Sequence, residues 1–159
     1  FIAACFGDQN LLELRDVMAS AETELYGGLS PRVAPMAQIR DLGSFLQRAN
    51  LALPVADSLK IPIKYNDLFH LMKDLRYMGE TNIMTDRRKS FTGRSLLECA
   101  QKKFKSRYSD ADGKVNCTFG LIFLSGWAPD DTQPKPLKPG SATKTLHQAI
   151  NEARPKPSY

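Results

Sequence analysis

The first six residues, Phe1-Ile2-Ala3-Ala4-Cys5-Phe6, are the stretch on which the interpretation of this chain depends. They are short, apolar and followed by Gly7-Asp8, a pattern that is typical of a buried β-strand. Natural amino-terminal segments are usually polar and frayed, whereas this one is apolar from its first residue and does not begin with Met. The sequence therefore predicts that Phe1 marks a break within a larger sheet, so that the chain is the carboxyl part of a longer protein.

The composition is that of a globular protein. The chain has 159 residues, of which 42% are hydrophobic and 25% are charged, and this length fits one ordinary domain. The longest strongly apolar run, Leu121–Leu124, is far too short to span a bilayer. The three cysteines, Cys5, Cys99 and Cys117, show no metal-binding or redox spacing, which favours a reducing compartment.

Hydrophobic periodicity predicts four helices. The apolar residues from Leu11 to Leu25 recur at steps of three and four, with Asp8 or Asn10 as the expected cap and Gly27-Gly28 as the stop. A second helix is expected from about Met36 to Ala49. A third is expected between a cap at Asn66 or Asp67 and Gly79. A fourth ends near Tyr108 and is expected to open with a capping box made by Ser95 and Glu98.

Two further strands are predicted. Apolar and polar residues alternate from Leu53 to Tyr65, and Pro54 and Pro62 within this run favour an edge or bulged strand. After an Asp110–Gly113 turn, Val115–Trp127 has the pattern of one long strand. Strands that alternate with helices indicate an α/β layered fold. We expect a domain over residues 1–128 and a tail rich in proline and lysine over 129–159, with a short helix near Thr143–Ala153.

The net charge of +5 is concentrated in one segment. Residues 87–107 carry seven net positive charges, so the remainder of the chain is slightly acidic. A segment of this kind binds nucleic acid or an acidic partner, or forms a solvated helix face preceded by a basic loop. We favour the solvated surface over nucleic-acid binding because no aromatic platform, zinc spacing or RNA-binding signature accompanies the charge.

Several kinds of chemistry lack their motifs. No glycine cluster forms a dinucleotide-binding turn or a P-loop. The only histidines, His70 and His147, are far apart in the sequence, so no histidine-based metal site is expected. From the residues alone, the sequence supports only the carboxyl half of an α/β protein.

A set of short strings nevertheless resembles a known family. These strings are Gly7 with Leu12–Arg15, Gly27–Pro35, Asp41-Leu42-Gly43, Asp74–Asn82, Asp112-Gly113, Gly126-Trp127 and Gly140–Thr143. In this order and spacing they resemble the carboxyl half of a class I S-adenosylmethionine-dependent methyltransferase over about residues 1–145. The most similar branch comprises alphaproteobacterial and mitochondrial proteins related to a complex I assembly factor, which is regarded as an arginine hydroxylase. The malonyl-carrier-protein methyltransferase of biotin biosynthesis is a more distant relative.

The resemblance implies a seven-stranded, mostly parallel sheet with helices on both faces. Phe1–Phe6 would be its fifth strand, Leu53–Tyr65 its sixth and Val115–Trp127 its antiparallel seventh. The family's cofactor turn and ribose-binding carboxylate belong to earlier strands, so S-adenosylmethionine is implied for the longer parent and is not expected to bind this chain. The implied location is the cytoplasm in a bacterium or the mitochondrial matrix in a eukaryote.

Candidate substrate-side residues follow from this placement, because ligands in open α/β sheets lie beyond the carboxyl ends of strands. The loop Gly27–Pro35 is expected either to fold over that crevice, with Arg32 attracting an acidic group, or to be a structural turn. Asp74 and Arg76 cannot face each other on a helix, so one is expected to hold the helix end and the other to reach the cleft. The alternative is a helix-terminating network around Gly79. The full candidate set is Gly7, Asp8, Gly27, Gly28, Ser30, Arg32, Asp74, Arg76, Thr81 and Asn82.

Three functions remain open at this point. The first is the substrate-side part of a methyltransferase, acting on a protein or carrier-protein acceptor. The second is a non-methylating member of the same fold, either an arginine hydroxylase or a protein-binding assembly module. The third is a nucleic-acid-binding domain that uses the basic segment. An uncovered strand edge is also expected to favour self-association.

Overall fold

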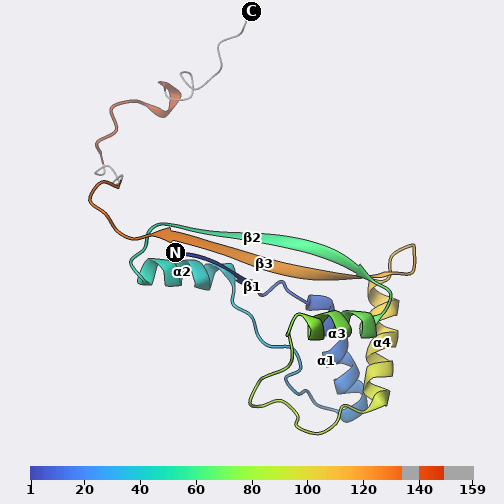
Figure 1. The fold of residues 1–159 in the computed structure, drawn as a ribbon. Coiled ribbons are helices and arrows are strands. Elements are labelled where there is room, and N and C mark those ends of the chain that lie inside the picture. Colours follow the sequence, from blue (N-terminus) through green and yellow to red (C-terminus); the bar gives the residue numbers. More distant parts are fainter. Residues whose placement is uncertain (134–139, 149–159) are drawn as a thin grey trace, which may run out of the picture. The chain divides into compact units, whose positions relative to one another are not determined.

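The computed structural model describes residues 1–133 and 140–148, which fall into two compact units, Phe1–Ala128 and Pro129–Tyr159. The first unit contains all the named elements, and their order confirms the predicted alternation of strands and helices (Figure 1). The elements are β1 (Ile2–Phe6), α1 (Leu12–Tyr26), α2 (Ile39–Arg48), β2 (Ala52–Tyr65), α3 (Leu68–Tyr77), α4 (Arg94–Tyr108) and β3 (Val115–Trp127).

The three strands form one sheet in the order β1-β3-β2. The last strand in the sequence is therefore the central one, and it runs antiparallel to both neighbours. Ala4 lies opposite Phe123 on one side of β3, and Ile63 lies opposite Cys117 on the other. As predicted from its prolines, β2 is an edge strand, and its pairing is irregular between Ala52 and Val55, around Pro54.

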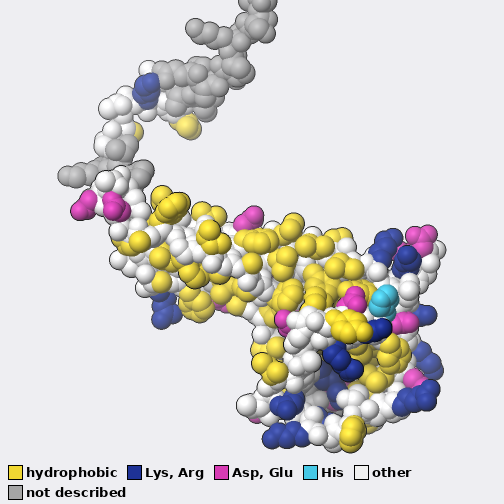
Figure 2. All heavy atoms as spheres, in the orientation of Figure 1, with side chains coloured by type: hydrophobic (Ala, Val, Ile, Leu, Met, Phe, Trp, Pro, Cys, Tyr) yellow, Lys and Arg dark blue, Asp and Glu magenta, His cyan; other side chains and the backbone are white. Residues whose placement is uncertain are grey.

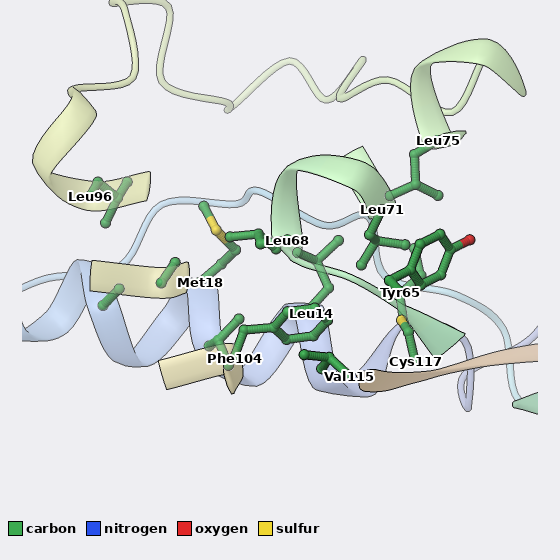
Figure 3. Packing of buried hydrophobic residues seen from close by; sticks show 14 of the residues in the cluster. Leu14, Met18, Tyr65, Leu68, Leu71, Leu75, Leu96, Phe104, Val115 and Cys117 are labelled. Carbon is green, nitrogen blue, oxygen red and sulfur yellow. The ribbon is translucent and has the colours of Figure 1, made fainter. Parts of the chain in front are cut away.

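The main core lies between the carboxyl half of β2, the first half of β3 and helices α1, α3 and α4 (Figure 3). Val115, Cys117 and Phe119 project into it from alternate positions of β3, as the two-residue period of a strand requires. Phe104 of α4 and Val17 of α1 are fully buried there. The predicted apolar faces of α1, α3 and α4 thus contribute to this core, whereas Leu25, the last residue of the stripe predicted for α1, is 41% exposed.

A smaller core lies on the opposite face of the sheet. Ile122 and Leu124 of β3 pack there against Leu46 of α2. In Figure 1, α2 lies near one end of the long β2–β3 ribbon, whereas α1, α3 and α4 gather at the other end. Each helical layer therefore covers only part of one face.

The remaining part of the sheet carries an apolar surface that no described helix covers. We call this surface the open face and define it by Ile2, Ala4, Val55, Leu59, Phe123 and Trp127. Ile2 is 88% exposed, Trp127 67% and Val55 56%, and Figure 2 shows hydrophobic side chains along this stretch. The expectation that the first strand is buried is wrong for this chain, because β1 pairs on one side only and its Ile2 face has no layer above it.

The ends of the helices confirm some of the predicted caps and overturn others. Asp67 caps α3 by accepting a hydrogen bond from the His70 N–H at 2.7 Å. Neither Asp8 nor Asn10 caps α1, which begins after Leu11 in a left-handed conformation. No capping box opens α4, because Glu98 instead binds Arg94 at 2.8 Å.

The start of α2 also differs from the expected one. The helix begins at Ile39 and not at Met36, because the Ala37 carbonyl accepts a hydrogen bond from the Asp8 N–H at 3.1 Å. This bond holds the segment in front of α2 against the end of β1.

In the second unit, residues 146–148 are helical and residues 143–145 are not, and positions 149–153 of the helix predicted near Thr143–Ala153 lie outside the described residues. No helix in the described part of the chain is both long and apolar enough to cross a bilayer.

Candidate functional site

A buried glutamate organises the loop after α1. Glu22 is 3% exposed, and its carboxylate accepts hydrogen bonds from the Ser30 N–H at 2.9 Å and from the Ser30 hydroxyl at 2.6 Å. The Arg32 guanidinium binds the same carboxylate at 2.8 Å. Burial raises the pKa of Glu22, but the bonds from Arg32 and Ser30 outweigh it and lower the pKa to about 2. Glu22 therefore stays ionised and fixes the loop.

Arg32 also forms one wall of a cavity that we call the arginine pocket. This cavity has a volume of about 470 Å³ and lies between α1, α3 and the loop that joins α3 to α4. Its charged lining consists of Arg32, Arg76, Glu80, Arg87 and Arg88, and its uncharged polar lining of Thr81, Asn82 and Thr92. In Figure 2, Lys and Arg side chains gather over this part of the first unit.

Hydrogen bonds hold the polar wall of the arginine pocket. The Asn82 amide donates to the Pro31 carbonyl at 2.8 Å and so ties the loop after α3 to the loop after α1. Arg32 donates to the Thr92 hydroxyl at 3.2 Å. Two loops that are distant in the sequence, the one after α1 and the one between α3 and α4, therefore form one wall.

A second cavity, of about 530 Å³, lies where the open face meets α3. It is lined mainly by apolar side chains, among them Phe6, Ile61 and Met78, together with Asp74 and Tyr65. Burial raises the pKa of Tyr65 to about 12, and the neighbouring Asp74 carboxylate adds to this shift. Tyr65 is therefore a neutral hydrogen-bonding group and not a base at physiological pH.

The turn after β1 lies beside a third cavity, of about 290 Å³, together with Ser58 and Lys60 of β2. Three of its backbone amides are already occupied: the Gly7 N–H donates to the Gly120 carbonyl, the Asp8 N–H to the Ala37 carbonyl and the Asn10 N–H to the Gly7 carbonyl. A Cβ atom on Gly7 would lie 2.5 Å from the Ile122 side chain. Packing explains this glycine, and the turn offers no free row of amides for a nucleotide cofactor.

The structure brings together only part of the candidate set. Arg32, Arg76, Thr81 and Asn82 line one cavity, and Ser30 supports it through Glu22. Gly7 and Asp8 lie at the third cavity and Asp74 at the apolar one. Gly27 ends α1 at φ 67°, and neither it nor Gly28 lines any of these cavities. Asp74 and Arg76 thus face different cavities, consistent with their spacing.

Sequence reasoning missed several residues of the arginine pocket. The sequence predicts a solvated basic loop at Arg87 and Arg88, whereas in the structure both residues line the arginine pocket. Glu22 lies beside Ala21 on the apolar face of α1, and a carboxylate at such a position was the signal of a buried ion pair. No cluster of His, Cys, Asp and Glu suited to a metal occurs among the described residues.

The comparisons with known proteins confirm the resemblance to methyltransferase-like proteins and place the homologues in two groups. No family model matches the chain. The Arginine-hydroxylase NDUFAF5, mitochondrial, of Dictyostelium discoideum is 41% identical over 145 residues, which are 91% of this chain and 33% of that protein. The human protein of the same name is 37% identical over 157 residues, which are 98% of this chain and 45% of that protein.

The second group consists of methyltransferases. The Malonyl-[acyl-carrier protein] O-methyltransferase of Xylella fastidiosa is 30% identical over 128 residues, which are 80% of this chain and 41% of that protein. These relatives imply a Rossmann-like fold. The chain spans a third to about half of the length of the curated relatives that it matches.

Proposed function

We propose that the chain is the acceptor-side part of an S-adenosylmethionine-dependent methyltransferase-like protein, in which β1, β2 and β3 are the fifth, sixth and seventh strands of the family's sheet. The observation that supports this most directly is the orientation of β3, which is antiparallel to both neighbours while β1 and β2 run parallel to each other. The open face and the free edge of β1 provide the surface on which the rest of such a sheet would pack.

In this proposal the parent protein binds the cofactor through its earlier strands, and this chain shapes the site for the methyl acceptor. Methyl transfer depends mainly on the alignment of donor and acceptor. The chain's own contribution is therefore positioning, through the loop held by Glu22 and the wall formed by Arg76, Thr81 and Asn82. We propose a protein or carrier protein as the acceptor, because the methyltransferase relatives are named for an acyl-carrier-protein substrate.

A second function is supported by the order of identities. Proteins named arginine hydroxylases are 36–41% identical to this chain, and those named methyltransferases are 26–30% identical. We therefore keep a non-methylating member of the fold, a hydroxylase or a complex I assembly module, as the alternative. The mitochondrial relatives favour the matrix as the location in a eukaryote, and the cytoplasm is the proposed location in a bacterium.

Nucleic-acid binding is the weakest of the three proposals. The basic segment is partly neutralised by ion pairs, among them Lys103 with Glu24 at 2.6 Å and Arg107 with Asp16 at 2.8 Å. Arg87 and Arg88 line the arginine pocket. A steep dependence of DNA affinity on salt is the result that would restore this function.

The test is a comparison of this chain with its full-length parent by calorimetric titration of S-adenosylmethionine. The parent is expected to bind the cofactor at micromolar concentrations and this chain is not. Alkylation of Cys5, which is exposed in this chain, is expected to be slow in the parent because the added sheet covers β1. Micromolar binding by this chain, or equally fast alkylation in both proteins, contradicts the proposal.

Mass spectrometry of the acceptor separates the two leading functions. The parent is incubated with its candidate acceptor protein and S-adenosylmethionine. Gain of a methyl group supports the methyltransferase, and gain of one oxygen supports the hydroxylase. A stable complex without either modification supports the assembly module.

A further inference from the structure

The arginine pocket has more positive charge than its own residues compensate. Four arginines and one glutamate, Glu80, line it, and Glu22 neutralises Arg32 from within the core. Two positive charges therefore remain. An excess of this kind on a concave surface attracts anions, because the low-dielectric walls focus the field.

The guanidinium groups keep donors available. Within residues 1–133 and 140–148, the Arg76 side chain has no hydrogen bond or ion pair. Arg87 donates one N–H to the Met84 carbonyl. Arg88 donates its Nε–H to the Ser90 hydroxyl, and its guanidinium lies over the Tyr26 ring. Each guanidinium has five N–H donors, so most of those on Arg87 and Arg88 remain free to bind an oxyanion.

The floor of the arginine pocket is apolar. Leu14 and Met18 of α1 and Met72 and Leu75 of α3 form it. All but Met72 are buried. The volume of about 470 Å³ falls in the range of roughly 300–1,000 Å³ that is typical of small-molecule sites. Guanidinium groups above an apolar floor match a ligand that has an anionic head and a hydrocarbon body.

We propose that the arginine pocket binds a small organic anion, namely a carboxylate or phosphate group on a short apolar body. Arg76 and Arg88 bind the anionic group, and the apolar side chains of α1 and α3 that form the floor contact the body. Planar guanidinium groups bind both oxyanions through paired hydrogen bonds. This inference adds a ligand class to the acceptor-side region and does not depend on methyl transfer, since binding is measured directly on this chain.

The test uses four probes of defined chemistry, namely hexanoate, hexyl phosphate, hexanol and acetate, titrated into the 159-residue chain. Hexanoate or hexyl phosphate is expected to bind, to shift the backbone amide NMR signals of Thr81, Asn82 and Thr92, and to bind more weakly as salt is added. Whichever of these two probes binds more tightly identifies the preferred head group, carboxylate or phosphate. Hexanol and acetate are expected to bind at least about tenfold more weakly, since hexanol lacks the anionic group and acetate lacks the hydrocarbon body.

Variants assign the binding to the pocket. Arg76→Gln is expected to weaken binding of the preferred probe about tenfold, the loss of one charge-assisted hydrogen bond. Arg40→Gln removes the same charge from α2, outside the pocket, and is expected to leave affinity unchanged. Glu80→Gln is expected to tighten binding about threefold, because it removes the negative charge that lines the pocket. A merely disrupted fold would not tighten binding.

The proposal is overturned if neither anion binds, if hexanol binds as well as hexanoate, or if Arg40→Gln weakens binding as much as Arg76→Gln. Circular dichroism of each variant shows whether its fold is retained. If Arg76→Gln fails to fold, the salt dependence and the Glu80→Gln result decide the outcome. These results are independent of cofactor binding by the parent, so failure here and failure of the proposed function are distinguishable.

Discussion

At the scale of single residues, Glu22 is the group whose ionisation matters most for the loop that forms the pocket wall. Its carboxylate is buried and accepts bonds from Arg32 and from two donors of Ser30. Loss of a charged hydrogen-bonding partner in a buried network leaves the remaining charge without compensation. If Glu22 loses its charge, the Arg32 guanidinium becomes an uncompensated charge of this kind.

We expect Glu22→Gln to lower the free energy of unfolding by about 2 kcal/mol at neutral pH, as is typical of hydrogen bonds to charged groups. The pKa of Glu22 is lowered from an ordinary value of 4.5 to about 2. Its contribution is therefore complete above pH 4.5 and is lost as the pH falls from 4.5 towards 2. Urea unfolding curves of the wild type and the variant are expected to converge over that window.

Glu24→Gln is the matched control, because Glu24 lies on the same helix and pairs with Lys103 at the surface. Its effect is expected to be much smaller than that of Glu22→Gln. A gap between wild type and Glu22→Gln that stays constant from neutral pH to pH 2 would contradict the assigned role of the Glu22 charge.

At the scale of elements, β3 and the turn before α1 are joined by a close crossing at Gly120. Its N–H donates to the buried Asn10 side chain at 3.3 Å, and its carbonyl accepts from the Gly7 N–H at 2.9 Å. A Cβ atom on Gly120 would lie 2.9 Å from the backbone of Gln9 and Asn10. The absence of a side chain at this position allows the two segments to touch.

Gly120→Ala is expected to destabilise the chain by about 2 kcal/mol, because the backbone of the turn has to move to relieve the overlap. Gly28→Ala is the control, since nothing lies within 4 Å of a Cβ atom there. Thermal unfolding followed by circular dichroism compares the two. A stability of Gly120→Ala equal to that of Gly28→Ala would show that the crossing adapts without cost.

Most elements could be predicted from the sequence, and most of the errors lie where tertiary contacts decide. The spacing of Leu14, Met18 and Ala21 was enough to define a helix face. The start of α2 was not predictable, because it depends on a bond between Ala37 and Asp8. The capping box at Ser95 and Glu98 failed for the same kind of reason, since Glu98 has a nearer partner in Arg94.

The candidate site could be predicted only in part. The sequence supplied Arg32, Arg76, Thr81 and Asn82, which do line one cavity. It did not indicate that Arg87 and Arg88 join them, because that depends on how the loop between α3 and α4 folds back over α1. The structural role of the string Leu12–Arg15 could not be predicted from the sequence either. Its Glu13 carboxylate accepts hydrogen bonds from the Thr118 N–H at 3.0 Å and from the Thr118 hydroxyl at 2.6 Å, and these bonds fix α1 to β3.

At the scale of the first unit, the open face is the dominant feature. Contiguous exposed apolar surface of this kind marks an interaction site, and β2 and β1 are both edge strands. This chain by itself is therefore expected to associate with copies of itself, whereas in the proposed parent the same surface is covered.

We expect sedimentation velocity of this chain to show dimers or larger species that increase with concentration. Leu59→Lys places a charge on the open face, where Leu59 is 49% exposed, and is expected to shift the population towards the monomer. Ser58→Lys is the matched control, because adjacent residues of a strand point to opposite faces. A monomer at all concentrations, or an equal effect of the two substitutions, would contradict this expectation.

The central place of β3 has a consequence for biosynthesis. A ribosome releases β2 before it makes β3, the strand with which β2 pairs, and α3 and α4 lie between the two in the sequence. Until Val115–Trp127 leaves the exit tunnel, β2 lacks this hydrogen-bonding partner, and such exposed segments are prone to aggregate. Nascent chains that stall before this point should therefore be preferred clients of chaperones.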